Sequence, residues 1–238
     1  MADEKTKRLV FLCSGGGGNL AFVHQMIELG RLPGISIIAV LTDRICQANN
    51  YAARVGLESR CLDFKEHGQL NLLSALDEFK PDLIITTVHK ILQKAVVERY
   101  RTQLINLHYS LLPAFGGLIG AQSVQASLDY GVFFSGVTVH SVDESVDGGK
   151  PLVQCVIALQ KYEPLEDLMQ VVFRCGCMAL LGAVRYMLEE SKGKFNPSSQ
   201  SILGRICLFN GGTVAPDQLF ESEDFWRSLK LSLEERPE

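Results

Sequence analysis

Two polar side chains alternate within an otherwise apolar segment, residues 104–108, where Asn106 and His108 are separated by one leucine. Because side chains alternate along a β-strand, both would lie on the same face of a strand. An amide can donate a hydrogen bond to an oxyanion developing on a carbonyl, and an imidazole can donate or carry a proton. The pair therefore indicates carbonyl chemistry, although a histidine taken alone is more often a satisfied core residue.

An acidic segment with a glycine pair follows a later strand-like segment. Residues 143–149 read Asp-Glu-Ser-Val-Asp-Gly-Gly. A carboxylate from this segment beside the imidazole of His108 would favour the protonated ring and fix its orientation. We therefore expect an amide, an imidazole and a carboxylate to meet in one site.

A run of four glycines, within Ser14–Asn19, stands between a strand-like and a helix-like segment. Backbone amides and the positive end of a helix form an anion site at such a junction, which predicts contact with a phosphate. No Gly-Lys-Ser/Thr follows, so this is not a Walker loop, and Leu20 stands where a dinucleotide fingerprint has its third glycine. The alternative is a turn that requires positive φ angles.

The elements that would position these residues alternate between apolar strand-like segments and segments of helical period, which predicts an α/β fold. We expect a Rossmann-like, mostly parallel sheet with helices on both faces. The expected strands are 9–13, 35–41, 59–62, 83–86, 104–108, 132–142 and 152–159, and the expected helices are 20–29, 49–55, 70–79, 91–99, one ending near 128, and 165–188.

The C-terminal part is more polar. Residues 191–201 contain glycine and proline and predict a loop, whereas Asn210-Gly211-Gly212 predicts a hairpin turn between strands at 205–209 and 213–214. We expect a polar N-terminal tail at 1–7, one domain at 8–220 and a charged C-terminal tail at 221–238 that is frayed after Trp226.

Composition narrows the class of protein. The 238 residues are 47% hydrophobic and 21% charged, which is globular, and the net charge of −4 offers no basic stripe for nucleic acid. Neither a secretory signal nor an apolar run of about 20 residues is evident, so we expect no membrane span. Seven scattered cysteines suit a reducing cytoplasm, and the pair Cys175 and Cys177 lacks the partners of a metal site, so we predict no metal. The oligomeric state is left open.

Four separated blocks resemble the folate-dependent formyltransferases in residues and in spacing. They are Asn106-Leu107-His108, Ser110-Leu111-Leu112-Pro113, Gly136-Val137-Thr138-Val139-His140 and Val146-Asp147-Gly148-Gly149. Residues 14–20, 80–84 and 210–211 look most like the purine-pathway branch of that family. The resemblance covers about residues 8–220.

The resemblance implies the formyltransferase fold and transfer of a formyl group from 10-formyltetrahydrofolate to a small amine, with no metal. The best acceptor is 5-phosphoribosylglycinamide. Three alternatives stay open: another amine, such as an amino sugar carried on a nucleotide; hydrolysis of formyltetrahydrofolate; and an inactive module that binds folate or a nucleotide.

Site residues follow from the same resemblance. Asn106, His108 and Asp147 match the catalytic residues, and the acceptor phosphate would be held by Gly17, Gly18 and Asn19. The folate pocket would be lined by Asn106, by His89, Lys90, Ile91 and Leu92, and by the closing loop of Asp143, Glu144, Ser145, Val146 and Asp147. His24 and His140 are expected to be structural.

Three segments depart from the purine-pathway pattern. Phe173-Arg174-Cys175-Gly176 stands where an acidic stretch contacts the acceptor, with Glu163 and Glu166 as possible replacements. Residues 115–120 lack the usual basic residue and histidine, and Lys65 is the nearest substitute for an arginine expected before the third helix. These departures concern the acceptor more than the chemistry.

Overall fold

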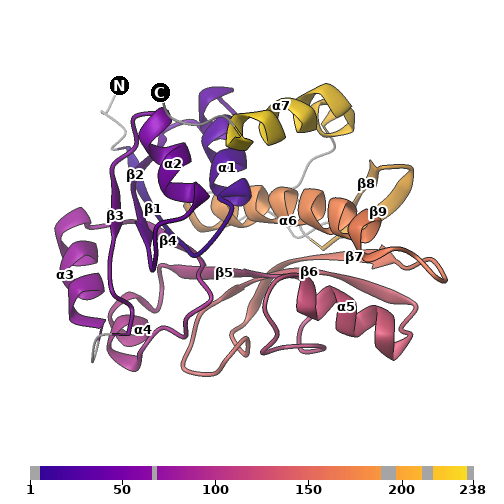
Figure 1. Ribbon diagram of the computed structural model, residues 1–238, viewed down its shortest axis with the longest axis horizontal. Coiled ribbons are helices and arrows are strands. Elements are labelled where there is room, and N and C mark those ends of the chain that lie inside the picture. Colours follow the sequence, from indigo (N-terminus) through magenta and orange to yellow (C-terminus); the bar gives the residue numbers. More distant parts are fainter. Residues whose placement is uncertain (1–5, 66–68, 189–196, 211–216, 235–238) are drawn as a thin grey trace. The chain divides into compact units, whose positions relative to one another are not determined.

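The computed structural model of the chain describes residues 6–65, 69–188, 197–210 and 217–234 (Figure 1). The chain divides into two compact units, which we describe separately. Unit 1 comprises Met1–Ile105 with Arg227–Glu238, and unit 2 comprises Asn106–Trp226. The strand β5 (Leu104–His108) contains the boundary. The expectation of one domain over residues 8–220 stays a prediction.

Unit 1 is an α/β layer structure with parallel strands in the order β3-β2-β1-β4. Right-handed crossovers between such strands place α1 and α2 on one face and α3 and α4 on the other, as Figure 1 shows. The predicted class, with helices on both faces, is confirmed. The strands are β1 (Lys7–Cys13), β2 (Ile35–Thr42), β3 (Ser59–Cys61) and β4 (Leu83–Thr87), and the helices are α1 (Gly18–Glu28), α2 (Gln47–Arg54), α3 (Leu70–Phe79) and α4 (Lys94–Tyr100).

The centre of this sheet is apolar on both sides. Four consecutive residues of β1, Leu9 to Leu12, have no solvent exposure, and Leu83 to Ile85 of β4 are equally buried. Continuous apolar runs of this kind are what a parallel strand covered on both faces requires. The segment Ser14–Asn19 follows β1 and runs into α1, and the segment His89–Leu92 lies in the loop after β4. The buried strands therefore determine where both segments start.

Unit 2 is built around an antiparallel sheet and one long helix. The strands β6 (Phe134–Ser141), β7 (Pro151–Ala158), β9 (Arg205–Phe209) and β8 (Ser198–Ile202) follow one another in that order. The helix α6 (Leu165–Leu188) packs on β6, β7 and α5 (Ala121–Tyr130). Its length and apolar composition would suit a membrane span, but most of it is buried, as in the core helix of a globular unit.

Unit 2 contains a hairpin that the sequence did not predict. Residues 198–201, expected in a loop, lie in β8, and the turn to β9 is at Leu203-Gly204, where both φ angles are positive. The Asn210 amide donates to the Gln154 carbonyl at 3.1 Å, and the Asn210 side chain accepts from the Gln154 amide at 2.7 Å. These bonds continue the pairing along β7. The proposed partner strand at 213–214 lies outside the described residues.

The fraying predicted after Trp226 is wrong as far as residue 234, because residues 223–234 form α7 (Glu223–Glu234) after the 3-10 turn η2 (Gln218–Glu221). Apolar residues three apart, Trp226 and Leu229, are buried and give this charged segment one anchoring face. Arg174 of α6 donates to both carboxylate oxygens of Glu223, at 2.5 and 2.8 Å, and lies over the Trp226 ring. The charged composition of this segment predicted a tail, although two buried apolar residues are enough to hold it as a helix.

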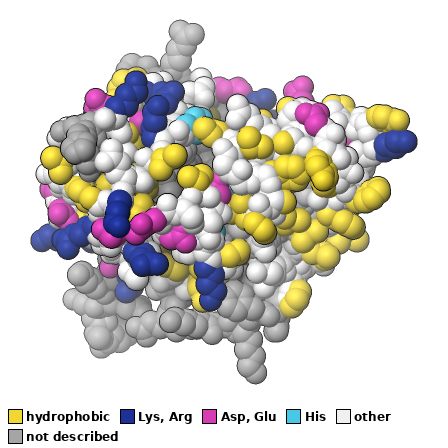
Figure 2. All heavy atoms as spheres, turned by 90° about the horizontal axis from the view of Figure 1, so that it is seen from below, with side chains coloured by type: hydrophobic (Ala, Val, Ile, Leu, Met, Phe, Trp, Pro, Cys, Tyr) yellow, Lys and Arg dark blue, Asp and Glu magenta, His cyan; other side chains and the backbone are white. Residues whose placement is uncertain are grey.

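Large apolar side chains also reach the surface of unit 2. Tyr130 and Phe133, between α5 and β6, are 81% and 83% exposed, and Phe134 is exposed beside them. Figure 2 shows hydrophobic side chains gathered on one part of the face it displays. Single exposed apolar residues are ordinary, but adjacent aromatic ones leave much apolar area in water.

Candidate active site

His108, at the end of β5, is 6% exposed and has an oxygen atom opposite each ring nitrogen. Its Nδ1 lies 3.2 Å from Oδ2 of Asp147, and its Nε2 lies 3.0 Å from the Phe115 carbonyl oxygen. Neutral imidazole has one N–H, whereas both oxygens can only accept, so the protonated ring satisfies both contacts. The carboxylate expected beside this histidine is present.

A second histidine completes the cluster. Nε2 of His140, at the end of β6, lies 3.2 Å from Oδ1 of Asn106 and 3.7 Å from Oδ1 of Asp147. Its Nδ1 faces the Ser141 carbonyl at 2.9 Å. His140 was expected to be structural, yet it orients the Asn106 amide and shares the carboxylate. Its position at the end of the block 136–140, just before the acidic segment, was the available signal.

Asp147 is held in an unusual conformation, with φ of +53°, which aspartate tolerates better than most residues. The Gly117 amide donates to its Oδ2 at 2.7 Å. Burial opposes ionisation of the carboxyl, but hydrogen bonds from His140 and Gly117 and the nearby histidine charges outweigh it, so the pKa of Asp147 lies below its usual value. The carboxylate is therefore the stable form.

The glycine pair after Asp147 lets the loop fold back tightly. A Cβ atom at Gly149 would lie 1.7 Å from the Ser141 carbonyl oxygen, and one at Gly148 would lie 2.1 Å from Ser145 Oγ. The Ser145 amide donates to Asp143 at 2.9 Å and its hydroxyl donates to the same carboxylate oxygen. Crowding by the Ser145 side chain and by the Ser141 main chain thus accounts for the glycines at positions 148 and 149.

The departing segment 115–120 contacts this cluster through its main chain. Phe115 supplies the carbonyl that faces His108, and Gly117 supplies the amide that faces Asp147. Positive φ angles at Phe115, Gly117 and Gly120 shape the segment. Its side chains differ from the family pattern, but two of its backbone groups address the candidate catalytic residues.

In unit 1, the glycine run ends at the start of α1. Gly17 is the N-cap residue, with φ of +71°, and a Cβ atom there would lie 3.0 Å from Ala48 Cα of α2. The helix begins with Gly18 and Asn19 and has no side-chain cap at Gly17. Gly17 therefore does need glycine for its positive φ angle. The main-chain amides at the uncapped start of α1 can in addition bind an anion.

The segment 89–92 is tied to the glycine loop within the same unit. The His89 amide donates to Oγ of buried Ser14 at 2.8 Å. Gln69 is also buried: its Nε2 donates to the Ile91 carbonyl at 3.2 Å, and its Oε1 accepts from the Gln93 amide at 3.0 Å. Sequence reasoning missed Gln69. Ile91 is 73% exposed, so this apolar side chain is not part of the core of unit 1.

A cavity of about 300 Å³ lies in unit 1 close to this segment. Three of its lining side chains are basic and two are acidic, so it can receive a polar ligand with negative groups. The lining residues are Asp43, Arg44, Asp63, Phe64, Lys65 and Lys90.

Comparison with known proteins decides the family. The formyl transferase family profile matches residues 7–184, which include the glycine loop and all four residues of the cluster. The chain belongs to the formyl transferase family.

Proteins similar to this chain include formyltransferases and a deformylase. The chain is 29% identical over 194 residues to a chloroplastic phosphoribosylglycinamide formyltransferase of Vigna unguiculata, covering 78% of this chain but 62% of that protein. A glycinamide ribonucleotide transformylase 1 from Geobacillus kaustophilus has a TM-score of 0.72 at 26% identity, covering 77% and 99% of the two chains. A formyltetrahydrofolate deformylase from Pseudomonas putida has 0.68 at 25%, covering 79% and 68%.

The helix segment that departs from this family is part of the core. A Cβ atom at Gly176 would lie 3.0 Å from the Tyr109 ring and 3.1 Å from Leu107. Arg174 pairs with Glu223, as described above, and Cys175 is fully buried. A glutamate at Gly176, as in the expected acidic stretch, would therefore require the Tyr109 ring and the Leu107 side chain to shift.

The expected replacements for that acidic stretch differ from each other. Glu163 is paired with Arg205, whose Nη1 lies 3.0 Å from Oε2 of Glu163, so its charge is already compensated. Glu166, in the first turn of α6, is exposed. Of the two, Glu166 is the one whose carboxylate solvent can reach.

Proposed function

We propose that this formyl transferase moves the formyl group of 10-formyltetrahydrofolate to the amine of 5-phosphoribosylglycinamide. The observation that carries the proposal is the cluster in which Asp147 faces both His108 and His140 while His140 faces Asn106. An amide, two imidazoles and a carboxylate are the groups that addition to a formyl carbonyl requires. The similarity to transferases of this substrate supports the acceptor.

The chemistry is an addition followed by an elimination. The free amine forms a C–N bond to the formyl carbon, whose oxygen becomes an oxyanion, and the bond from that carbon to N10 of the folate then breaks. Nδ2 of Asn106 and a protonated His108 donate to the oxyanion. The attacking nitrogen loses one proton and N10 gains one. The carboxylate of Asp147 would favour the protonated form of His108, which can pass this proton on.

His108 must exchange one partner before it can donate to substrate, because both of its ring nitrogens already face protein oxygens. The Phe115 carbonyl at Nε2 is a neutral acceptor, whereas the Asp147 carboxylate at Nδ1 carries charge. Hydrogen bonds between charged groups are the stronger ones, so the substrate oxygen would replace the Phe115 carbonyl.

The acceptor phosphate would bind the glycine loop. Gly17, Gly18 and Asn19 bring main-chain amides to the positive end of α1, which has no capping side chain at Gly17. Main-chain amides do not titrate in the ordinary pH range. Any pH dependence of phosphate binding should therefore come from the phosphate and not from the groups of the protein that bind it.

The folate would contact the segment 89–92 and the loop 143–147. Gln69 and Ser14 hold the first segment in an open, exposed conformation, and Val146 is an exposed apolar residue of the second. The carboxylates of the folate's glutamate suit the cavity that contains Lys65 and Lys90. Lys65 takes the place of the expected arginine.

A different amine acceptor is the second candidate, and one observation favours it. Gly176 and Arg174, which occupy the acidic positions of the purine-pathway relatives, are committed to packing and to the ion pair with Glu223. This stretch of α6 therefore supplies no carboxylate for the acceptor. A nucleotide-linked amino sugar would not need that contact.

The test measures by absorbance the loss of the formyl group from 10-formyl-5,8-dideazafolate. The reaction is run with 5-phosphoribosylglycinamide, with a nucleotide-linked amino sugar, or with no amine. Loss of the formyl group that depends on 5-phosphoribosylglycinamide supports the proposal. Loss that depends on the amino sugar alone reassigns the acceptor, and release of formate without any amine identifies a hydrolase, as in the deformylase relative. No loss under any condition would contradict formyl chemistry.

A further inference from the structure

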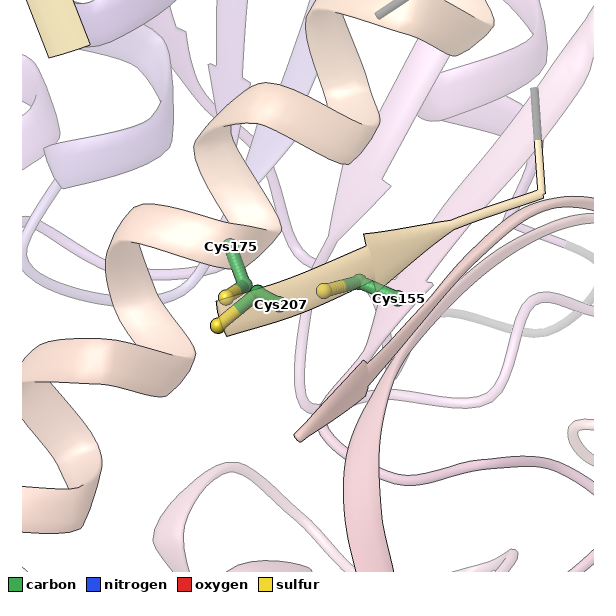
Figure 3. A group of neighbouring side chains, drawn as sticks. All are labelled: Cys155, Cys175 and Cys207. Carbon is green, nitrogen blue, oxygen red and sulfur yellow. The ribbon is translucent and has the colours of Figure 1, made fainter. Parts of the chain in front are cut away.

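Three cysteine side chains from three different elements of unit 2 converge in its interior. Cys155 comes from β7, Cys175 from α6 and Cys207 from β9, and their sulfur atoms all lie within 4.8 Å of one another (Figure 3). None of the three is exposed to solvent. Cysteine is often a buried small hydrophobe, but that role does not require three thiols to point at one spot.

The other buried cysteines show the contrast. Cys177 lies two residues from Cys175 in the same helix and is equally buried, yet it is not part of the group. Cys13 is buried in unit 1 and is likewise outside it. Convergence is thus specific to one face of α6 and to the two strands that pack beneath it.

Strand register argues against a disulfide between the two sheet cysteines. Cys155 is opposite Phe209 and Val156 is opposite Leu208, so Cys207 is diagonal to Cys155, two positions from its direct partner. Diagonal neighbours have Cα atoms about 7–8 Å apart, beyond the limit of about 7 Å for an unstrained disulfide. Their side chains can nevertheless meet at a third atom between them.

The spacing of the sulfurs suits a bridging cation. Metal–thiolate bonds of about 2.3 Å in a trigonal arrangement place the three sulfur atoms about 4.0 Å apart. The observed limit of 4.8 Å requires only small side-chain rotations to reach that geometry. No fourth Cys, His, Asp or Glu belongs to the group among the residues the structure describes.

We propose that Cys155, Cys175 and Cys207 form a three-coordinate site for a soft, thiophilic cation, of which Cu⁺ is the type. Thiolates select soft cations, and a monovalent d¹⁰ ion accepts three ligands, whereas structural Zn²⁺ sites are almost always four-coordinate. Binding replaces thiol protons with the cation, so no redox step is needed. The site is independent of formyl transfer and of its substrates.

The three cysteines join the edge hairpin to the interior elements of unit 2. β9 and β8 form the hairpin at the edge of the unit 2 sheet, where local opening is easiest and gives a cation access. A bound cation would fasten β9 to β7 and to α6. Because it binds the folded chain through three elements that are distant in sequence, it should raise the unfolding temperature.

The experiment uses the full chain, reduced and without oxygen, titrated with Cu⁺ against a chromogenic Cu⁺ chelator. We expect one Cu⁺ per chain, with affinity reduced at least 100-fold in Cys155→Ala, Cys175→Ala and Cys207→Ala. Cys177→Ala is the matched control in the same helix, and Cys46→Ser with Cys61→Ser removes the two more accessible thiols. Both controls should keep the wild-type affinity.

Thermal unfolding with and without Cu⁺ gives a second readout, and circular dichroism confirms that each variant is folded. The unfolding temperature should rise with Cu⁺ in the wild type and in the controls but not in the three variants. Equal binding in all variants, or no stoichiometric binding, would overturn the site. Tighter binding of Zn²⁺ than of Cu⁺ would overturn its three-coordinate assignment.

Discussion

The glycine loop of unit 1 and the histidine cluster of unit 2 use opposite means to bind a ligand. The loop offers main-chain amides at the start of α1, and its glycines matter for conformation and for space. The cluster offers side chains, and Asn106, His108, His140 and Asp147 are linked by contacts of 3.2–3.7 Å. The loop should therefore be sensitive to added side-chain volume, and the cluster should be sensitive to a change of functional group.

The two sites differ because the charge of one ligand is constant during the reaction and the charge of the other changes. A phosphate keeps its charge throughout the reaction, so fixed amide dipoles suffice. A formyl oxygen gains charge only during the reaction, so donors that respond by moving protons are required. Substitutions in the loop should therefore act on affinity, and substitutions in the cluster should act on turnover.

The largest effect is expected in the cluster. His108→Ala and Asp147→Asn should each lower kcat by about two to four decades with little change in folate affinity, because acid–base groups act mainly in the transition state. Steady-state kinetics with the dideaza folate measures both parameters. His24→Ala, which removes a histidine bonded to Tyr51 in unit 1, is the control. Normal turnover in either cluster variant would show that the site is misassigned.

His140 should have a smaller effect on turnover because it acts through Asn106 and Asp147. Loss of a hydrogen bond that orients a buried polar group costs about 1–3 kcal/mol, so His140→Ala should lower kcat about 10- to 100-fold. The KM for folate should stay within about twofold, as binding is not its role. A fall in folate affinity with unchanged kcat would make His140 a binding residue instead.

The two kinds of glycine in the loop can be separated. Gly17→Ala places a Cβ at a positive φ and against Ala48, and the left-handed conformation alone costs about 1–2 kcal/mol, so stability should fall. Gly15 has open space around its Cβ position and no positive φ. Chemical denaturation of both variants measures the difference, and equal stability loss would refute it.

Gly15→Ala should instead affect the acceptor alone. A methyl group on the loop moves a phosphate away from the amides, so the KM for the acceptor should rise several-fold while kcat and the folate KM stay unchanged. Inorganic phosphate should compete with the acceptor in the wild type. Unchanged acceptor kinetics would reduce the glycine run to a turn.

The smallest expected effect is on stability in acid. The pKa of Asp147 is lowered in the folded state, so its ionisation adds stability above the ordinary carboxyl pKa, and this is lost as pH falls through the lowered value. Asp147→Asn should remove that part of the acid limb below about pH 4, where ordinary carboxyl groups titrate. Urea unfolding between pH 6 and 3 compares the two chains. Parallel stability curves would contradict the charge assignment.

Much of the fold was readable because it depends on local periodicity. The bounds of α3, β5 and α6 agree with the predicted ranges, since their apolar residues follow one face or one buried strand throughout. The β8–β9 hairpin was missed because the polar residues 191–201 predict a loop, whereas the pairing of β9 with β7 that supports the hairpin is distant in sequence.

The site divides in the same way. The trio of Asn106, His108 and Asp147 could be named from spaced blocks, but the structure adds His140 and the main chain of Phe115 and Gly117. A backbone carbonyl or amide can be supplied by any residue type, so side-chain identity does not reveal it. The cysteine group also escaped prediction, because positions 155, 175 and 207 acquire a common neighbourhood only when a strand, a helix and a hairpin pack together.

The docking of α7 has a practical consequence. Trp226, the single tryptophan of the chain, is 6% exposed, lies 5.1 Å below the Arg174 guanidinium and donates its indole N–H to the Phe220 carbonyl at 3.0 Å. Tryptophan fluorescence, excited selectively beyond the tyrosine absorption, therefore reports only on the surroundings of Trp226, where rings from η2 and α7 pack against the indole. An emission shift records release of the C-terminal helix, and the phosphate loop and the histidine cluster are silent in that signal.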